Sequence, residues 1–445
     1  MKRYSSYKDS GVEWIGEIPS GWRISKLKFE STIIGRIGYR GYTTNDIVDE
    51  GFGVITLSPS NITKDQKLNL NNSTYLSWEK YKESPEIQIF NGDIILVKTS
   101  SIGKVSIIEN VNQELTLNPQ LIVLKEIKQE NKFLYYCLIS DIIQYQLEIS
   151  KSGGVTPTIT QETINSFNTP LPPLSEQQQI VSYLDEKISL VDTLIQSKQK
   201  KISLLKEKRT SLINQLVTKG LNPDVEMKDS GVEWIGEIPM SWASPKLGFY
   251  TIKIGSGSTP RGGSEIYVES GVPFIRSQNV HFSGLDLSDV TFITPEIHYS
   301  MSGTTVRKSD VLLNITGGSI GRCCLVDTDE EMNVNQHVSI IRTKNSLNPY
   351  LLNYILSSDI GQKQVEYNIS GGNREGLTID GISNFYIPIP SKTEQQQIVE
   401  FLDKETSLID KTVSIEERKI ELLKEYKQSL ISEVVTGKRK VVSDE

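Results

Sequence analysis

DSGVEWIGEIP, residues 9–19, occurs again without a mismatch at residues 229–239. A second string, EQQQIV, fills residues 176–181 and returns at residues 394–399. Two identical strings displaced by nearly the same distance indicate tandem copies of one structural unit, here of about 220 residues. We call residues 9–22 and 229–242, which end at Trp22 and Trp242, the opening segments of the two copies.

Between these strings the two copies share a skeleton but little identity. GDIILVKTSSIGKVSII, from Gly92, aligns with SDVLLNITGGSIGRCCLV, from Ser309. Runs rich in β-branched residues predict strands within residues 52–62, 93–100, 104–109 and 120–127. Apolar stretches predict helices at residues 131–149 and 348–367. We expect two tandem α/β (α+β) domains, each built on a twisted sheet.

A long heptad helix follows each domain. Apolar positions alternate steps of three and four over several heptads, which is typical of a coiled-coil seam. The seam includes Val181, Leu184, Val191, Lys198 and Leu205 in the first helix, and Val399, Leu402, Ile409, Glu416 and Leu423 in the second. Two matched seams in one chain favour pairing of the two helices with each other. If they pair antiparallel with full overlap, Lys198 lies beside Glu416 near a pseudo-twofold axis. Packing of each helix on its own domain is the alternative.

The expected ends of these helices follow from capping residues. Ser175 and Thr393 have capping-box spacing to the glutamines three residues later. Gly220 and Gly437 stand where the helices should stop.

Composition bounds the class of protein. The 445 residues carry a formal net charge of −7, which does not exclude a nucleic-acid partner because phosphate binding depends on local clusters of charge. No apolar run has the length of a membrane span, so we expect a cytoplasmic protein without membrane contact. Cys137, Cys323 and Cys324 lack metal-ligand spacing, so no metal site is expected.

No catalytic constellation stands out. Gly103-Lys104 lacks the glycine that a phosphate loop needs five residues earlier, where Lys98 stands. Glu126 and Lys128, with Asp93 upstream, have the spacing of one class of metal-dependent nuclease, but chance produces such triplets in a chain this rich in charges. The histidines are scattered without a paired nucleophile: His281, His298 and His337. We expect no catalytic residues and no enzyme activity in this chain.

Several polar loops suit DNA reading. GRIGYRGYTT, residues 35–44, sets arginines among glycines and tyrosines, and IGSGSTPRGG, residues 254–263, is its counterpart. Glycine lets the backbone approach phosphates, and arginine donates to guanine edges or phosphates. SPSNI, residues 58–62, aligns with RSQNV, residues 276–280, and KTSS from Lys98 with ITGG from Ile315. For each loop, an ordinary solvated loop is the alternative.

The candidate DNA-binding residues come from these loops and from the neighbouring strand ends. They are Arg36, Tyr39, Arg40, Tyr42, Ser58, Ser60, Asn61, Lys98, Thr99 and Lys104 in the first copy, and Ser258, Thr259, Arg261, Arg276, Ser277, Gln278, Asn279, Thr316, Arg322, Asn373 and Arg374 in the second.

The combination of these features resembles the specificity subunit of type I restriction-modification enzymes. It consists of two GVEWIGEIP segments, a diverged α/β domain after each, the string PLPPLSEQQQIV and a long heptad helix. The resemblance covers essentially the whole chain. It implies target-recognition domains at residues 1–170 and 223–388, and conserved coiled-coil helices at residues 171–222 and 389–445.

The same resemblance implies a function. Each target-recognition domain would read one half of a bipartite site in double-stranded DNA. The two helices would pair antiparallel, which gives the chain pseudo-twofold symmetry, and would act as a spacer. They would also dock two modification (methyltransferase) subunits and, through them, the restriction (motor and nuclease) subunits. S-adenosylmethionine, ATP and Mg²⁺ would be held by those partners, and no cofactor by this chain.

Two other classes of function remain. A self-contained restriction endonuclease is disfavoured because the methyltransferase and phosphate-loop motifs are missing. A coiled-coil adaptor protein that binds only protein would not need two diverged domains rich in β-structure.

Overall fold

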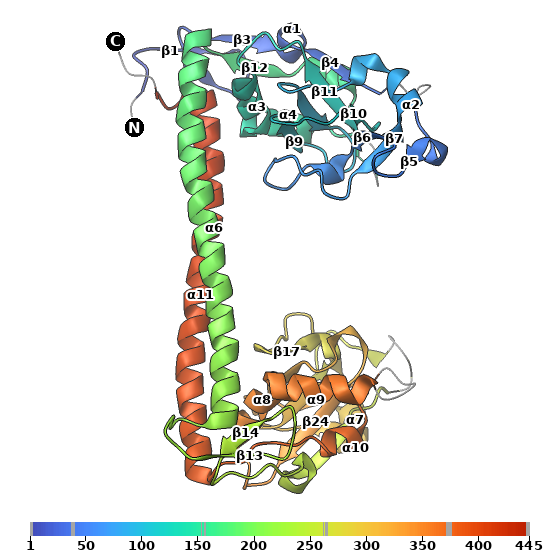
Figure 1. The fold of residues 1–445 in the computed structure, drawn as a ribbon, viewed down its shortest axis with the longest axis vertical. Coiled ribbons are helices and arrows are strands. Elements are labelled where there is room, and N and C mark those ends of the chain that lie inside the picture. Colours follow the sequence, from blue (N-terminus) through green and yellow to red (C-terminus); the bar gives the residue numbers. More distant parts are fainter. Residues whose placement is uncertain are drawn as a thin grey trace. The chain divides into compact units, whose positions relative to one another are not determined.

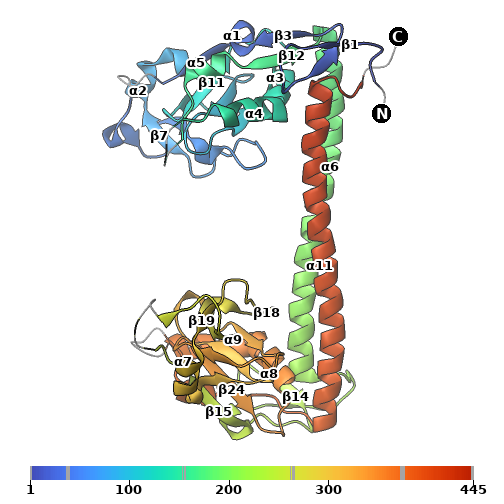
Figure 2. The same ribbon diagram turned by 180° about the vertical axis from the view of Figure 1, so that it is seen from behind.

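The computed structural model of the chain describes residues 3–36, 41–152, 154, 157–260, 262, 266–370 and 376–441. The chain divides into two compact units, Met1–Lys198 with Arg418–Glu445, and Gln199–Glu417. Each unit holds one α/β domain and a part of each of two long helices, α6 (Leu174–Lys219) and α11 (Lys392–Val435) (Figures 1 and 2). The first unit is therefore built from two segments that lie far apart in the sequence, whereas the second is one continuous stretch.

Two four-stranded sheets form the first domain. The helix-facing sheet contains, in order, β4 (Thr32–Gly35), β11 (Leu121–Lys125), β8 (Ile94–Val97) and β9 (Val105–Ile107), all antiparallel. The second sheet contains β10 (Leu115–Leu117), β6 (Gly53–Leu57), β7 (Thr74–Ser77) and β5 (Ile47–Val48), with β10 parallel to β6. Two-stranded pairs complete it: β1 (Tyr7–Asp9) with β2 (Glu17–Pro19), and β3 (Arg23–Lys26) with β12 (Asn168–Leu171).

The second domain repeats this plan. Its helix-facing sheet contains β15 (Thr251–Ser256), β24 (Val338–Thr343), β21 (Val311–Asn314) and β22 (Cys323–Leu325). Its second sheet contains β19 (Thr291–Ile293), β16 (Val272–Ile275), β23 (Met332–Val334) and β20 (Thr305–Val306), with β16 parallel to β23. The small pairs are β13 (Met227–Asp229) with β14 (Glu237–Pro239), and β17 (Val280–His281) with β18 (Gly284–Leu285). The expected tandem α/β domains are confirmed.

The central strands are mostly apolar because both faces of the helix-facing sheet are covered, and β8 is apolar at every position. In β8, Ile94 and Leu96 belong to the core shared with the helices, whereas Ile95 and Val97 belong to the core between the two sheets. A strand buried on both faces reads as a continuous apolar run instead of an alternating one. The alignment of IILV with VLLN therefore marks the same central strand in both domains.

Short helices complete each domain. In the first unit these are α1 (Leu27–Glu30), α2 (Trp78–Lys82), α3 (Asn131–Ile139), α4 (Asp141–Ile149) and α5 (Gln161–Asn165). In the second they are α7 (Pro295–Ser300), α8 (Pro349–Ser357), α9 (Asp359–Ser370) and α10 (Ile379–Ser383). The expected continuous helices at residues 131–149 and 348–367 are wrong in one respect, because each is broken by a serine with an extended backbone, Ser140 and Ser358. The Ser140 hydroxyl donates to the carbonyl of Cys137, which ends α3.

The long helices pair with each other, as the seams predict, and they run antiparallel, as the resemblance implies. In the second unit Lys201 and Arg209 of α6 form ion pairs with Glu416 and Asp410 of α11, each at 3.0 Å, so residue numbers fall along α11 as they rise along α6. In the first unit Asp192 pairs with Lys427 at 2.7 Å. Glu416 is buried and has Lys201 as a partner. Lys198 belongs to the other unit, so its expected place beside Glu416 stays a prediction.

The long helices end where the sequence predicts, but their N-terminal caps differ from the prediction. Gly220 and Gly437 follow the last turns with φ of 72° and 71°, a left-handed conformation that favours glycine. The expected caps Ser175 and Thr393 lie inside the first turn. The carbonyl of Pro173 accepts from the amides of Glu176 and Gln177, and the Ser391 hydroxyl accepts from the amide of Glu394.

The opening segments attach the end of a long helix to a domain. Trp22 is buried against Gly437 in the first unit, and Trp242 against Gly220 in the second, where its Nε1 also donates to Glu394 at 3.0 Å. In the first segment Trp14 packs on Tyr145 of α4, with the ring centroids 5.9 Å apart. A duplicated segment thus makes the same junction in both units.

We expect Gly437→Ala to destabilise the first unit by roughly 2 kcal/mol, because alanine is strained at positive φ. A Cβ there would also lie 2.4 Å from ring atoms of Pro19. The measurement is calorimetric unfolding. Gly21→Ala is the matched control, since Gly21 belongs to the same opening segment and a Cβ at it meets nothing within 4 Å. If the two variants had the same melting temperature, the result would contradict the proposed junction.

Candidate nucleic-acid interface

Polar strand ends gather on one edge of the first domain, which we call the first edge. It consists of Arg36 at the end of β4, the loops after β6 and β8, and the turn between β10 and β11. The amide of Lys98 donates to the carbonyl of Gln120 at 2.9 Å, and the hydroxyls of Thr99 and Thr158 lie 3.1 Å apart. Lys104 donates to the carbonyls of Pro59 and Ile62 at 3.0 and 2.9 Å. These contacts link the loop after β8 to the loops that follow β6 and β10.

Arg36 has a structural role in this conformation. Its Nε donates to the carbonyl of Leu117 at 2.8 Å and its Nη2 to the Thr116 hydroxyl at 3.1 Å, while the guanidinium lies over the Tyr42 ring. Only 5% of Arg36 is exposed, and burial lowers the pKa of its guanidinium. This arginine, expected to reach DNA, ties the end of β4 to β10. Tyr39 and Arg40 lie outside the described residues.

The aligned asparagines Asn61 and Asn279 are also used by the fold. Each ends a short 3₁₀ helix, Pro59–Asn61 or Ser277–Asn279. Their Oδ1 atoms accept from the amides of Ser58 and Arg276, both at 2.9 Å, and both side chains are buried. The repeated asparagine therefore stabilises the loop. The neighbouring residues Ser60 and Gln278 are exposed to solvent.

The equivalent edge of the second domain, the second edge, brings together four loops. Thr316, just after β21, contacts His337 Nδ1 through its hydroxyl, and Thr259, in the loop after β15, donates to Gln336. Asn314 donates to the carbonyl of Ser277 at 2.8 Å, which connects β21 to the loop after β16. Ser258 is exposed beside Thr259.

Two more candidate residues on this edge are held by one aspartate. Arg276 Nη2 donates to the carbonyl of Asp289 at 3.3 Å, and Gln278 donates to its carboxylate at 2.8 Å. The buried Nε of Arg276 has no hydrogen-bond partner among the described residues. Arg322 lies at the same end of the sheet, since its amide donates to Ser319 and its carbonyl accepts from Asn314. Arg261, Asn373 and Arg374 lie outside the described residues.

Sequence reasoning missed the turn that joins the second sheet to the helix-facing sheet. Asn118 and Asn335 begin this turn in the two domains, and Gln120 and His337 end it. The signal was available as LTLNPQLIVL, residues 115–124, which aligns with MNVNQHVSII, residues 332–341. The shared asparagine stands between two apolar runs, where a turn is expected.

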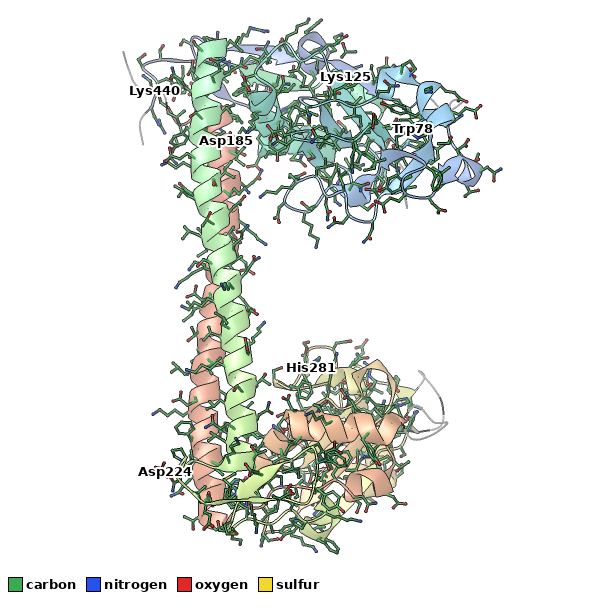
Figure 3. All side chains as sticks on the ribbon, in the orientation of Figure 1. Trp78, Lys125, Asp185, Asp224, His281 and Lys440 are labelled. Atoms are coloured by element: carbon green, nitrogen blue, oxygen red, sulfur yellow. The ribbon has the colours of Figure 1, made fainter. Side chains whose placement is uncertain are left out.

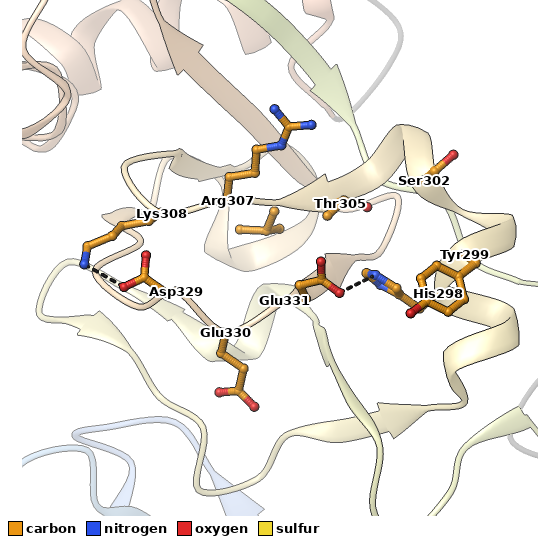
Figure 4. Close-up of a pocket in the computed structure, with 10 residues that line it drawn as sticks. His298, Tyr299, Ser302, Thr305, Arg307, Lys308, Asp329, Glu330 and Glu331 are labelled. Atoms are coloured by element: carbon orange, nitrogen blue, oxygen red, sulfur yellow. Dashed lines mark hydrogen bonds and ion pairs between the residues drawn. The ribbon is translucent and has the colours of Figure 1, made fainter.

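Away from these edges, a pocket of about 540 Å³ opens beside α7 and β20 (Figure 4). The buried His298 contacts Asn333 through Nδ1, and its Nε2 lies 3.3 Å from the exposed Glu331. Nothing that lines this pocket pairs a nucleophile with a base. Within the described ranges, no group of three or more His, Cys, Asp or Glu side chains is arranged to hold a metal ion. None of the described helices is long and apolar enough to cross a membrane.

Comparison with known proteins gives a consistent family. A relative from Methanocaldococcus jannaschii, provisionally named the MjaX specificity subunit of a type I restriction enzyme, is 25% identical over 438 residues and covers 96% of each chain. The MjaVIII specificity subunit of the same organism is 26% identical over 326 residues, which are 71% of this chain and 73% of the relative.

The fold has a solved counterpart as well. A chain from a structure of type I restriction-modification complex assembly aligns with a TM-score of 0.70 at 19% identity, over 94% of this chain and 98% of that chain. The family model described as "Type I restriction modification DNA specificity domain" matches residues 56–204 and 251–425, which is more than half of the chain. The chain therefore belongs to the type I restriction-modification DNA specificity family.

Proposed function

We propose that this chain reads a bipartite DNA site, with one domain for each half-site, and performs no chemistry itself. The observation that carries the proposal is the pair of edges. Both are built from the same strand ends and the same buried asparagines, yet they display different side chains. A common frame with different displayed groups suits two readers of two different base sequences, because base edges are distinguished by their donor and acceptor patterns.

Two modification subunits are the proposed direct partners, and restriction subunits join through them. Apolar side chains that are 40–59% exposed lie on the long helices outside the seam. They are Leu190, Leu194, Leu422 and Tyr426 in the first unit, and Leu204, Phe401, Leu408 and Ile415 in the second. Leu190 and Leu408 occupy the same position of the repeat, as do Leu204 and Leu422. An exposed apolar stripe repeated in both units supports docking of two copies of one partner.

The cofactors belong to those partners in this proposal. S-adenosylmethionine, ATP and Mg²⁺ would act on the modification and restriction subunits, and the assembly would work in the cytoplasm. Binding of labelled S-adenosylmethionine by the purified chain alone would count against the proposal.

The test of DNA binding compares two basic residues that lie near opposite ends of β21. In the complex with its modification subunits, Arg322→Ala should weaken binding to every DNA sequence and lower the slope of log K against log salt by about 0.9, the loss expected for one phosphate contact. Lys308→Ala is the control, because Lys308 precedes β21 at its other end and pairs with Asp329. Titration of labelled DNA at several salt concentrations measures both, and an equal loss in the control would contradict the proposed edge.

A further inference from the structure

The turns missed by sequence reasoning share one rigid frame. The amides of Asn118 and Asn335 donate to the carbonyls of Leu57 and Ile275, at 2.9 and 3.0 Å, and so continue the parallel strand pairs β6 with β10 and β16 with β23. Their Oδ1 atoms accept from the amides of Gln120 and His337, two residues on, at 2.9 and 3.1 Å. Both asparagines are 8% exposed. The frame fixes where the next two residues stand.

The two domains place different residues on this frame. The first has Pro119 and Gln120, and the second has Gln336 and His337. In the second domain the exposed Gln336 is held on both sides: its Oε1 accepts from Thr259, and its Nε2 lies 3.2 Å from His337 Nε2. His337 is held in turn by the Thr316 hydroxyl at Nδ1. Loops after three different strands thus orient one amide at the second edge.

The hydrogen-bond capacity of that amide points to a base. A glutamine side chain offers two donors and two acceptor positions. Thr259 uses one acceptor position and His337 uses one donor. Within the described structure, one donor and one acceptor remain on the exposed side. If the amide were turned over, Thr259 and His337 would exchange donor and acceptor roles and the remainder would be the same.

We propose that Gln336 reads the adenine of one A·T pair in the half-site of the second domain, through the major groove. Adenine presents the N6 donor and the N7 acceptor there, which a glutamine amide matches with two hydrogen bonds. His337 is a positioning residue that holds the amide. This assignment rests on the proposed function. Pro119 carries no side-chain donor at the equivalent position, so the first domain does not read a base in this way.

The experiment uses the chain assembled with its modification subunits and a library in which every base pair of the second half-site is varied. Gln336→Ala should flatten the preference at a single A·T position by about 5- to 150-fold, with the other positions unchanged. Gln336→Glu has the same size but turns the donor into an acceptor that faces adenine N7, so adenine should be disfavoured more strongly at the same position. His337→Ala should lower the preference there by a smaller factor.

Pro119→Ala, on the same frame in the first domain, is the control and should leave the second half-site unchanged. A loss of affinity for all sequences in Gln336→Ala would make the residue a phosphate contact, and an unchanged profile would remove it from the interface. Either result would overturn the assignment of Gln336. The proposed function would still stand as long as the wild-type complex prefers specific DNA sequences. A wild-type complex without any sequence preference would overturn both.

Discussion

Exchanging residues 27–167 for the corresponding segment of another family member should change one half of the recognised DNA site completely and leave the other half intact. The structure explains why these limits are suitable. The segment lies between β3 and β12, which pair antiparallel from Arg23 with Leu171 to Lys26 with Asn168. The graft would therefore enter and leave through a two-stranded junction that stays native.

The grafted segment must also keep the contacts that the native domain makes with the long helices. Asp185 of α6, labelled in Figure 3, lies 3.0 Å from Lys132 of α3. The Tyr136 hydroxyl donates to the same carboxylate. The amide of Glu130 donates to Gln177, the second residue of the EQQQIV string. The second domain makes the same contact between Asn348 and Gln395. Donor segments should therefore be chosen with a helix that begins at this place.

Methylome sequencing of a host that carries the exchanged chain is the measurement. The reciprocal exchange of residues 247–385, which lie between the equivalent pairs Ala243 with Ile389 and Lys246 with Tyr386, serves as the matched control. It should change the other half-site. If either exchange altered both halves, the domains would not read independently.

Repetition in the sequence predicted most of the architecture, for a physical reason. The opening segments and the glutamine string make similar junctions twice, so the buried side chains of both copies meet the same constraints, among them Trp22 and Trp242. Gln177 and Gln395 illustrate this constraint, since each side chain is buried and binds both the domain and the start of a long helix. The seams were predictable because a heptad is a local pattern that packing of one helix on another requires.

The DNA edges were harder to predict because polar residues have two uses. Arg36 and Asn61 have the composition of a DNA-contacting loop, yet both are buried and bonded to the backbone of their own domain. Burial depends on strands that lie far away in the sequence, such as β10 for Arg36. The turn with Gln336 was missed for a different reason: it is only three residues long, and the asparagine that marks it stands out only when the two copies are aligned.

Asp310→Ala should lower the melting temperature of the second unit by about 10 °C, which corresponds to roughly 3–5 kcal/mol for a buried ion pair that loses one partner. Asp310 Oδ1 and Oδ2 lie 2.7 and 2.8 Å from Nε and Nη2 of Arg342 in β24. The same carboxylate accepts from the amide of Arg307 at 2.7 Å. Its side chain is 1% exposed and that of Arg342 is 19% exposed, so removing the carboxylate would leave a guanidinium largely buried without its charge partner.

The matched variant is Asp93→Asn in the first unit, at the same place in the repeat. Asp93 lies 3.9 Å from Lys125 (Figure 3) and accepts from the amide of Phe90, and burial raises the pKa of its carboxyl. A folded pKa above the unfolded value means that the folded unit binds the proton more tightly. The stabilisation by protonated Asp93 is present at pH below the unfolded pKa of about 3.9 and is lost as pH rises through the folded pKa.

Asp93→Asn should therefore leave the first unit as stable or more stable at pH 7 and flatten its pH dependence above about pH 4. Calorimetric scans of both variants from pH 4 to pH 8 compare the two positions directly. If both variants were destabilised by a similar amount, the repeated aspartate would have the same structural role in both domains. The different geometries of Arg342 and Lys125 predict instead that one carboxylate holds its domain together through a charge pair, while the other serves mainly as an acceptor for the turn that carries it.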